Sequence, residues 1–89
     1  METKDACVLF KALSDESRLK IVKALLKNKE ICACKLLDVV NCSQPTLSHH
    51  MKVLIKSGLV CERKEWKWTH YSLDEKLKEE LVSFLFQGK

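Results

Sequence analysis

The hydrophobic positions in the first half of the chain recur at helical spacing. Residues 5–13 carry an apolar stripe spaced i, i+3, i+4, i+7, which is typical of an amphipathic helix. Ser14 or Asp15 can cap a second helix that ends near Asn28, because their side-chain oxygens accept hydrogen bonds from the first free N–H groups of a helix. A third, shorter helix is expected over about residues 31–40.

A fourth helix is predicted from Ser43 onward. Ser43 is a good N-cap, and Pro45 falls within the first turn, where a missing N–H is tolerated. Gly58 is expected to end the helix, since glycine readily adopts the left-handed conformation that often follows a last turn. Four apolar side chains at helical spacing are expected to face inward: Leu47, Met51, Leu54 and Ile55.

The pattern then changes to that of a β-hairpin. Residues 59–65 and 67–73 indicate two short strands, joined by a turn around Trp66 that lacks the usual glycine. A last helix is expected over about residues 74–86, with leucine and phenylalanine on one side. The predicted order is α-α-α-α-β-β-α, a mainly α fold with a β-hairpin.

This order indicates a winged helix-turn-helix. The third helix is short and turns quickly into the fourth, as in helix-turn-helix pairs, and the hairpin that follows is the wing. At 89 residues the chain is long enough for one domain and too short for two. We expect a single winged helix-turn-helix domain over residues 1–89, with a recognition helix at about 43–57 and a wing at about 60–73.

Composition narrows the class of protein. The chain is 46% hydrophobic, whereas disordered chains have lower hydrophobicity. Its polar start shows no signal peptide and no stretch approaches the length of a membrane span, so we expect a cytoplasmic protein with no membrane partner. Its 5 cysteines would stay reduced there, which favours thiolate chemistry or metal ligation over a disulfide scaffold.

Charge is distributed unevenly along the chain. The net charge is only +4, yet no acidic residue occurs from residue 41 to residue 60. In a helix-turn-helix the second helix enters the major groove of DNA, where short polar side chains and cations suit bases and phosphates. The alternative is a solvated helix face. The candidate DNA-binding residues are Gln44, Thr46, Ser48, His49, His50 and Lys52 on the helix and Arg63, Lys64 and Lys67 on the wing.

Three stretches of the sequence carry a family resemblance. Residues 11–21 (KALSDESRLKI), 44–54 (QPTLSHHMKVL) and 57–60 (SGLV) resemble the ArsR/SmtB family of metal-responsive repressors, over about residues 6–85. The resemblance implies a homodimer that represses its operon and releases operator DNA when an inducer binds. It also implies a dimer interface built from the first and last helices, here Leu9, Phe10, Leu13, Leu77, Leu81, Phe84 and Leu85.

A further motif points to the inducer. Residues 30–36 (EICACKL) resemble the thiolate signature of the arsenic and cadmium sensors of this family. Thiolates are soft ligands that select soft ions; As(III) and Sb(III) bind three sulfurs, whereas Cd(II) and Zn(II) normally take four ligands. We expect As(III) or Sb(III) as the inducer, with Cd(II), Pb(II) or Zn(II) as the alternative and no organic cofactor.

Cys32 and Cys34 form the centre of the predicted ion site. Residues two apart lie about 200° apart around an α-helix, so both thiols can bind one ion only where the turn is irregular. Binding would then distort the start of a helix that abuts the recognition helix. Leu37 stands where one branch of the family has a third cysteine. In the cadmium-sensing branch the other subunit completes the site, which makes Cys7 the expected third ligand, with Cys42 in reserve.

Other hypotheses stay open from the sequence. Cys32 and Cys34 can instead be core residues or a thiol-redox sensor, and a winged helix can dock a protein in place of DNA. Cys61, on the first predicted strand, is expected to be buried and structural. An enzyme is not expected, because the chain has no Cys-x-x-Cys motif, no glycine-rich phosphate loop and no βαβ unit.

Overall fold

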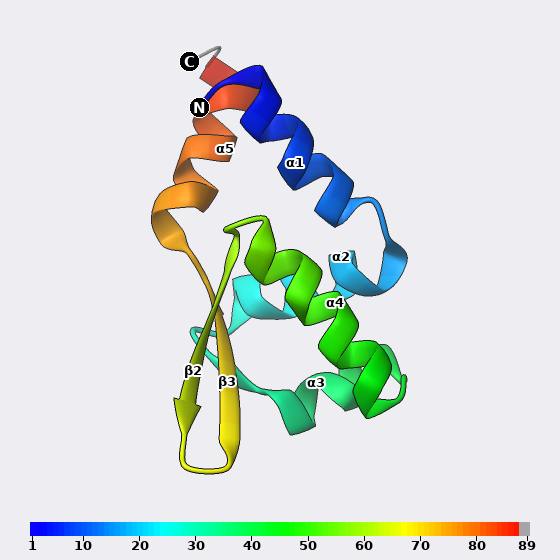
Figure 1. The fold of residues 1–89 in the computed structure, drawn as a ribbon. Helices are drawn as coiled ribbons and strands as arrows, with labels where there is room; N and C mark the ends of the chain where they lie inside the picture. Colours follow the sequence, from blue (N-terminus) through cyan, green and yellow to red (C-terminus); the bar gives the residue numbers. More distant parts are fainter. Residues whose placement is uncertain (88–89) are drawn as a thin grey trace.

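The structure is a computed structural model that describes residues 1–87 (Figure 1). Its elements are α1 (Thr3–Leu13), α2 (Glu16–Lys27), β1 (Ile31–Cys32), α3 (Ala33–Val40), α4 (Gln44–Lys56), β2 (Val60–Glu65), β3 (Trp68–Leu73) and α5 (Glu75–Gln87). The mainly helical fold with an antiparallel hairpin is confirmed. The predicted order is wrong in one respect, because the short strand β1 stands where the sequence predicted the first turn of the third helix.

Polar side chains cap the starts of α2 and α4, and a residue in the left-handed conformation ends α3. Asp15 accepts a hydrogen bond from the Arg18 N–H at the start of α2, and Ser43 accepts one from the Thr46 N–H at the start of α4. Between α3 and α4, Asn41 adopts the left-handed conformation (φ 48°), which polar residues of this kind tolerate. The chain therefore turns from α3 directly into α4, as a helix-turn-helix requires.

The core lies where helices α1 to α4 meet one face of the sheet. Leu36 of α3 and Met51 and Leu54 of α4 have no exposed surface, and each contributes roughly 1.5–3 kcal/mol by burial. The predicted inner face of α4 is confirmed for Leu47, Met51 and Leu54. This shared apolar centre holds the two helices of the helix-turn-helix together.

The three strands form one antiparallel sheet in the order β1-β3-β2. On the central strand, His70 pairs with Cys32 of β1 on one side and with Arg63 of β2 on the other. Successive side chains of a strand point to opposite faces. Tyr71 and Leu73 therefore turn into the core, where both are buried, and His70 lies on the outer face.

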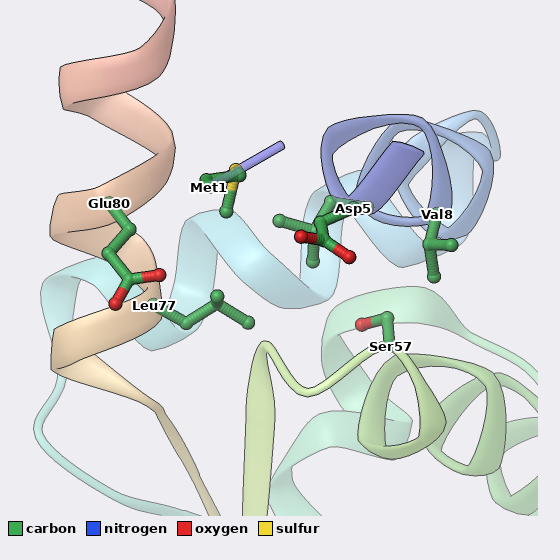
Figure 2. A pocket seen from close by; sticks show the side chains of 7 residues that line it. Met1, Asp5, Val8, Ser57, Leu77 and Glu80 are labelled. Atoms are coloured by element: carbon green, nitrogen blue, oxygen red, sulfur yellow. The ribbon is translucent and has the colours of Figure 1, made fainter. Parts of the chain in front are cut away.

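Helix α5 rises from the end of β3 toward the start of α1 (Figure 1). None of its described residues is buried, although Leu77 and Leu81 are partly buried against the core. A cavity lined by Met1, Asp5, Val8, Leu9, Ser57, Leu77 and Glu80 separates the start of α5 from α1 (Figure 2). The two helices leave several large apolar side chains exposed, among them Val8, Phe10, Val82, Leu85 and Phe86.

Leu9 differs from the other residues predicted for a dimer interface. It is only 1% exposed within the single chain, because α1 turns it toward the core together with Ala6 and Ala12. The assignment of Leu9 to an interface is therefore wrong. No helix within residues 1–87 has the length and apolar character needed to cross a membrane.

Gly58 makes the predicted turn from α4 into the hairpin. Its φ is +90°, and a Cβ added there would lie 3.2 Å from Cδ2 of Leu77. Gly58→Ala should therefore lower the free energy of unfolding by about 1–2 kcal/mol, as measured by urea denaturation. Lys56→Ala, at an exposed position of the last turn of α4, is the control and should change it by less than about 0.5 kcal/mol. Equal destabilisation of the two variants would contradict this account of the turn.

Candidate functional site

The outward face of α4 is polar and carries no acidic side chain. Gln44, Thr46, Ser48, His49 and Lys52 are all exposed, opposite the buried face that packs on the core. A groove runs between this helix and the hairpin. Its charged lining residues are Lys52, Lys56, Glu62 and Lys64, so positive charge predominates where helix and hairpin adjoin.

His50 is placed differently from its neighbours on α4. Its side chain is only 12% exposed, and its Nδ1 lies 3.1 Å from Nη1 of Arg18 and 3.9 Å from a carboxylate oxygen of Asp15. The Arg18 backbone N–H, helped by the Arg18 guanidinium, holds the pKa of Asp15 below its usual value. Arg18 also donates from Nε to the carbonyl oxygen of Ala12. His50, predicted as a DNA contact, thus ties α4 to the corner between α1 and α2.

Two lysines of the hairpin remain available to an anionic partner. Lys64 lines the groove beside α4. Lys67 lies in the turn, with its Nζ 5.0 Å from the ring centre of Trp66 and 5.4 Å from that of Trp68, within the range of cation–π contacts. Trp66 makes the turn with a φ of 59° and is 87% exposed. The tip of the hairpin therefore carries the ammonium group of Lys67 in contact with two aromatic rings.

The thiols of Cys32 and Cys34 lie together at the start of α3. Cys32 is the N-cap residue and has an extended backbone (φ −70°, ψ 143°), and the two Sγ atoms are 3.2 Å apart. Two sulfurs that share an ion at about 2.3 Å each lie within about 4.6 Å of one another. The hydrogen bond to Cys32 raises the pKa of the Cys34 thiol. The irregular turn that joint binding requires is already present, because β1 supplies it.

The other three cysteines lie away from this pair. Cys7 is exposed on α1, and Figure 1 places α1 and α3 at opposite ends of the molecule. Cys42 is half-buried beyond the far end of α3. Cys61, predicted to be buried, is exposed, because the buried Val60 turns its neighbour outward, toward Asp74. Within residues 1–87 no group of three or more His, Cys, Asp or Glu side chains is arranged to hold a metal ion.

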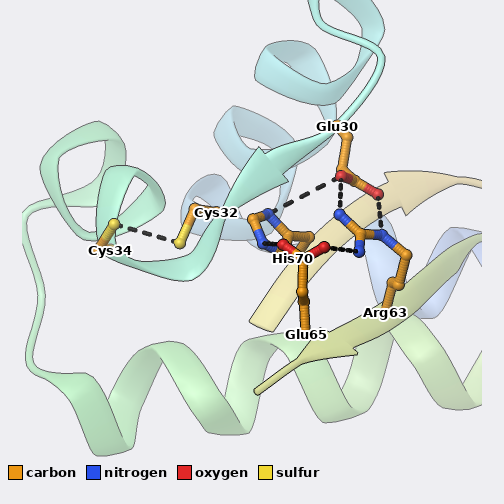
Figure 3. A network of polar contacts seen from close by, with 6 residues as sticks. All are labelled: Glu30, Cys32, Cys34, Arg63, Glu65 and His70. Atoms are coloured by element: carbon orange, nitrogen blue, oxygen red, sulfur yellow. Dashed lines mark hydrogen bonds and ion pairs between the residues drawn. The ribbon is translucent and has the colours of Figure 1, made fainter. Parts of the chain in front are cut away.

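A polar network lies beside the thiol pair on the outer face of the sheet (Figure 3). Arg63 donates from Nε and Nη2 to the two carboxylate oxygens of Glu30, at 3.0 and 2.7 Å, and its Nη1 lies 3.3 Å from Glu65. These bonds from Arg63 hold the pKa of Glu30 below its usual value. The ring nitrogens of His70 lie 3.8 Å from Glu30 and 3.9 Å from Glu65.

Sequence reasoning missed this network and assigned Arg63 to DNA. Arg63 instead points away from the groove beside α4 and is already paired with carboxylates. The strand pattern could have indicated part of the network, since Arg63, Glu65 and His70 occupy positions on the same face of the predicted hairpin. The partner Glu30 comes from the segment that leads into β1, a strand that the sequence did not reveal.

Comparisons with known proteins show which family this chain resembles in sequence and in fold. The sequence profile of the family described as "Bacterial regulatory protein, arsR family" matches residues 15–61. The arsenical resistance operon repressor of Staphylococcus aureus is 42% identical over 85 residues, which cover 96% of this chain and 81% of that protein. The cadmium resistance transcriptional regulatory protein CadC homolog of Staphylococcus aureus is 39% identical over 82 residues, covering 92% and 68%. The structure of HlyU from Vibrio cholerae N16961 superposes with a TM-score of 0.76 at 38% identity, covering 97% of this chain and 98% of that one.

Proposed function

The chain belongs to the ArsR family of bacterial regulatory proteins, and from this premise we propose that it is a homodimeric transcriptional repressor that releases operator DNA when a thiophilic ion binds. The proposed inducer is As(III) or Sb(III). The observation that carries the proposal is the Cys32–Cys34 pair, whose Sγ atoms lie 3.2 Å apart at the start of the helix-turn-helix. The family consists of regulators and not of enzymes, so the chain is assigned no catalytic role.

The proposed DNA surface is the outward face of α4 together with the hairpin. The exposed side chains of Gln44, Thr46, Ser48 and His49 can donate to and accept from base edges. Lys52 on the helix and Lys64 and Lys67 on the hairpin supply positive charge for phosphates. His50 acts behind this surface, since its contact with Arg18 sets the orientation of α4.

The proposed ion site takes two sulfurs from Cys32 and Cys34 and a third from Cys7 of the other subunit. Three sulfurs suit As(III) or Sb(III), which is why these ions are preferred to Cd(II), Pb(II) or Zn(II). Cys42 is the reserve ligand, but it lies beyond the far end of α3, and a helix of eight residues is about 12 Å long. The relatives named for arsenical and cadmium resistance support a soft ion.

A second copy of this chain is the proposed partner of α1 and α5. These helices expose more large apolar side chains than a lone small domain would leave in water. With Leu9 excluded, the proposed interface consists of Phe10, Leu13, Leu77, Leu81, Phe84 and Leu85. Such a dimer presents two α4 helices to the two halves of an operator in the cytoplasm.

DNA binding is tested by its dependence on salt. Affinity for an inverted-repeat duplex, measured by fluorescence anisotropy, should fall about a hundredfold or more between 50 and 200 mM salt if four or more phosphates are contacted. Lys52→Gln should weaken binding and reduce the salt slope by about one for each phosphate that the lysine neutralises. Lys23→Gln, an equal charge change on the exposed side of α2, is the control and should leave the slope unchanged. Absence of binding at low salt would rule out the repressor.

The thiol pair is tested by replacing sulfur with oxygen, a hard ligand that binds soft ions poorly. Cys32→Ser and Cys34→Ser should each bind the duplex within about twofold of the original protein, yet no longer release it when arsenite is added. Cys61→Ser removes an exposed thiol outside the pair and should respond like the original protein. Normal release by the Cys32→Ser/Cys34→Ser double variant would show that the ion binds elsewhere, and release by peroxide without any ion would favour a redox sensor.

The source of the third sulfur is tested with mixed dimers. Cys7→Ser should bind arsenite more weakly than the original protein in a calorimetric titration, whereas Cys42→Ser should match it. Dimers that combine a Cys7→Ser subunit with a Cys32→Ser/Cys34→Ser subunit should regain one tight site per dimer, because only a ligand from the other subunit can complete it. Unchanged affinity in Cys7→Ser together with weaker binding in Cys42→Ser would move the ligand to Cys42.

A further inference from the structure

One row of residues connects the thiol pair with the hairpin. Cys32 of β1 pairs with His70 of β3, and His70 pairs on its other side with Arg63 of β2. Paired residues lie on the same face of a sheet, so these side chains stand next to one another. Glu30 lies two residues before Cys32 and faces the same side, where it contacts both Arg63 and His70 (Figure 3).

The Glu30–Arg63 contact adds to a weak backbone connection. β1 has two residues and pairs with β3 at only two positions, Ile31 with Tyr71 and Cys32 with His70. Arg63 reaches across β3 and donates two charge-assisted hydrogen bonds to Glu30, at 3.0 and 2.7 Å. Bonds of this bidentate kind are among the strong and geometrically specific ones. The side-chain contact therefore connects the β1 segment with β2, a strand that β1 does not touch through its backbone pairing.

We propose that Glu30 and Arg63 are positioning residues that couple ion binding at Cys32 to the placement of the hairpin. The proposal rests on the proposed function, since it assigns the route by which the ion weakens DNA binding. A displacement of Cys32 carries the Glu30 carboxylate with it, because the two residues belong to one short extended segment. Arg63 stays hydrogen-bonded to this carboxylate, so β2 is displaced together with it.

The consequence for DNA lies one residue further along β2. Lys64 follows Arg63 and points to the opposite face, where it lines the groove beside α4. A shift of β2 therefore moves a proposed phosphate contact relative to the recognition helix. Arg63 acts through this displacement and does not itself need to reach the DNA, which agrees with its pairing to Glu30 and Glu65.

The coupling is tested with Glu30→Gln, which keeps the shape of the side chain and removes its charge. Arsenite affinity of the free protein and duplex affinity of the ion-free protein should stay within about twofold of the original values. The factor by which saturating arsenite weakens duplex binding should fall about two- to fivefold, the range expected for the loss of a partly exposed ion pair. Because coupling is reciprocal, the duplex should weaken arsenite binding by the same smaller factor.

Glu65→Gln is the matched control. It removes the second carboxylate at Arg63, 3.3 Å away, but Glu65 belongs to the hairpin itself and does not connect it to β1. The same charge is removed at the same guanidinium, so a general effect of charge would appear in both variants. The coupling factor of Glu65→Gln should equal that of the original protein.

Tryptophan fluorescence gives a second readout that needs no DNA. The chain has 2 tryptophans, and both lie on the hairpin, Trp66 in the turn and Trp68 at the start of β3. Arsenite should change their emission in the original protein and in Glu65→Gln, and change it less than half as much in Glu30→Gln.

The outcomes separate this proposal from the proposed function. A coupling factor in Glu30→Gln equal to that of the original protein, or equally reduced in Glu65→Gln, would overturn the role of the Glu30–Arg63 pair. Loss of arsenite binding itself in Glu30→Gln would also overturn it, since Glu30 would then support the ion site directly. If the original protein binds the duplex but arsenite does not release it, the proposed function fails instead.

Discussion

The pairing of Ile31 and Cys32 with β3 is the interaction on which the arrangement of this protein depends. It replaces the first turn of α3 by an extended backbone, and this brings the sulfurs of Cys32 and Cys34 to 3.2 Å. In a regular helix the same two side chains would point in nearly opposite directions. The pairing also places Cys32 directly beside His70 and within one row of Arg63. One short stretch of strand thus decides both the geometry of the thiol pair and what lies next to it.

Two separate sets of contacts hold the proposed DNA-binding elements in place. His50, Arg18 and Asp15 fasten the recognition helix to the start of α2. Glu30 and Arg63 fasten the hairpin to the β1 segment, on the side of the thiols. The helix and the hairpin can therefore respond differently to a change at Cys32, because only the hairpin shares a charged contact with that segment.

Much of the fold follows from local signals in the sequence. The caps at Asp15 and Ser43 and the turn at Gly58 depend on one or two residues, and each is found where it was predicted. β1 was missed because two residues are too few to show alternation, and its existence depends on β3, about forty residues later. Arg63 and Cys61 were misplaced for a related reason. The face of a strand on which a side chain lies depends on register and burial, which a short sequence pattern does not determine. The partner of Arg63 is Glu30, which precedes β1, and β1 could not be predicted from the local pattern.

The position of β2 has a consequence for how copies of the protein meet. β2 lies at the edge of the sheet, and an edge strand presents free N–H and C=O groups to any other strand that approaches. Its consecutive residues Glu62, Arg63, Lys64 and Glu65 place charges of both signs along that edge. An edge strand of another molecule could pair with β2 only by desolvating these charged side chains. Extension of the sheet from one molecule to the next is therefore disfavoured. The dimer proposed above, which forms through the apolar side chains of α1 and α5, would leave the hairpin free.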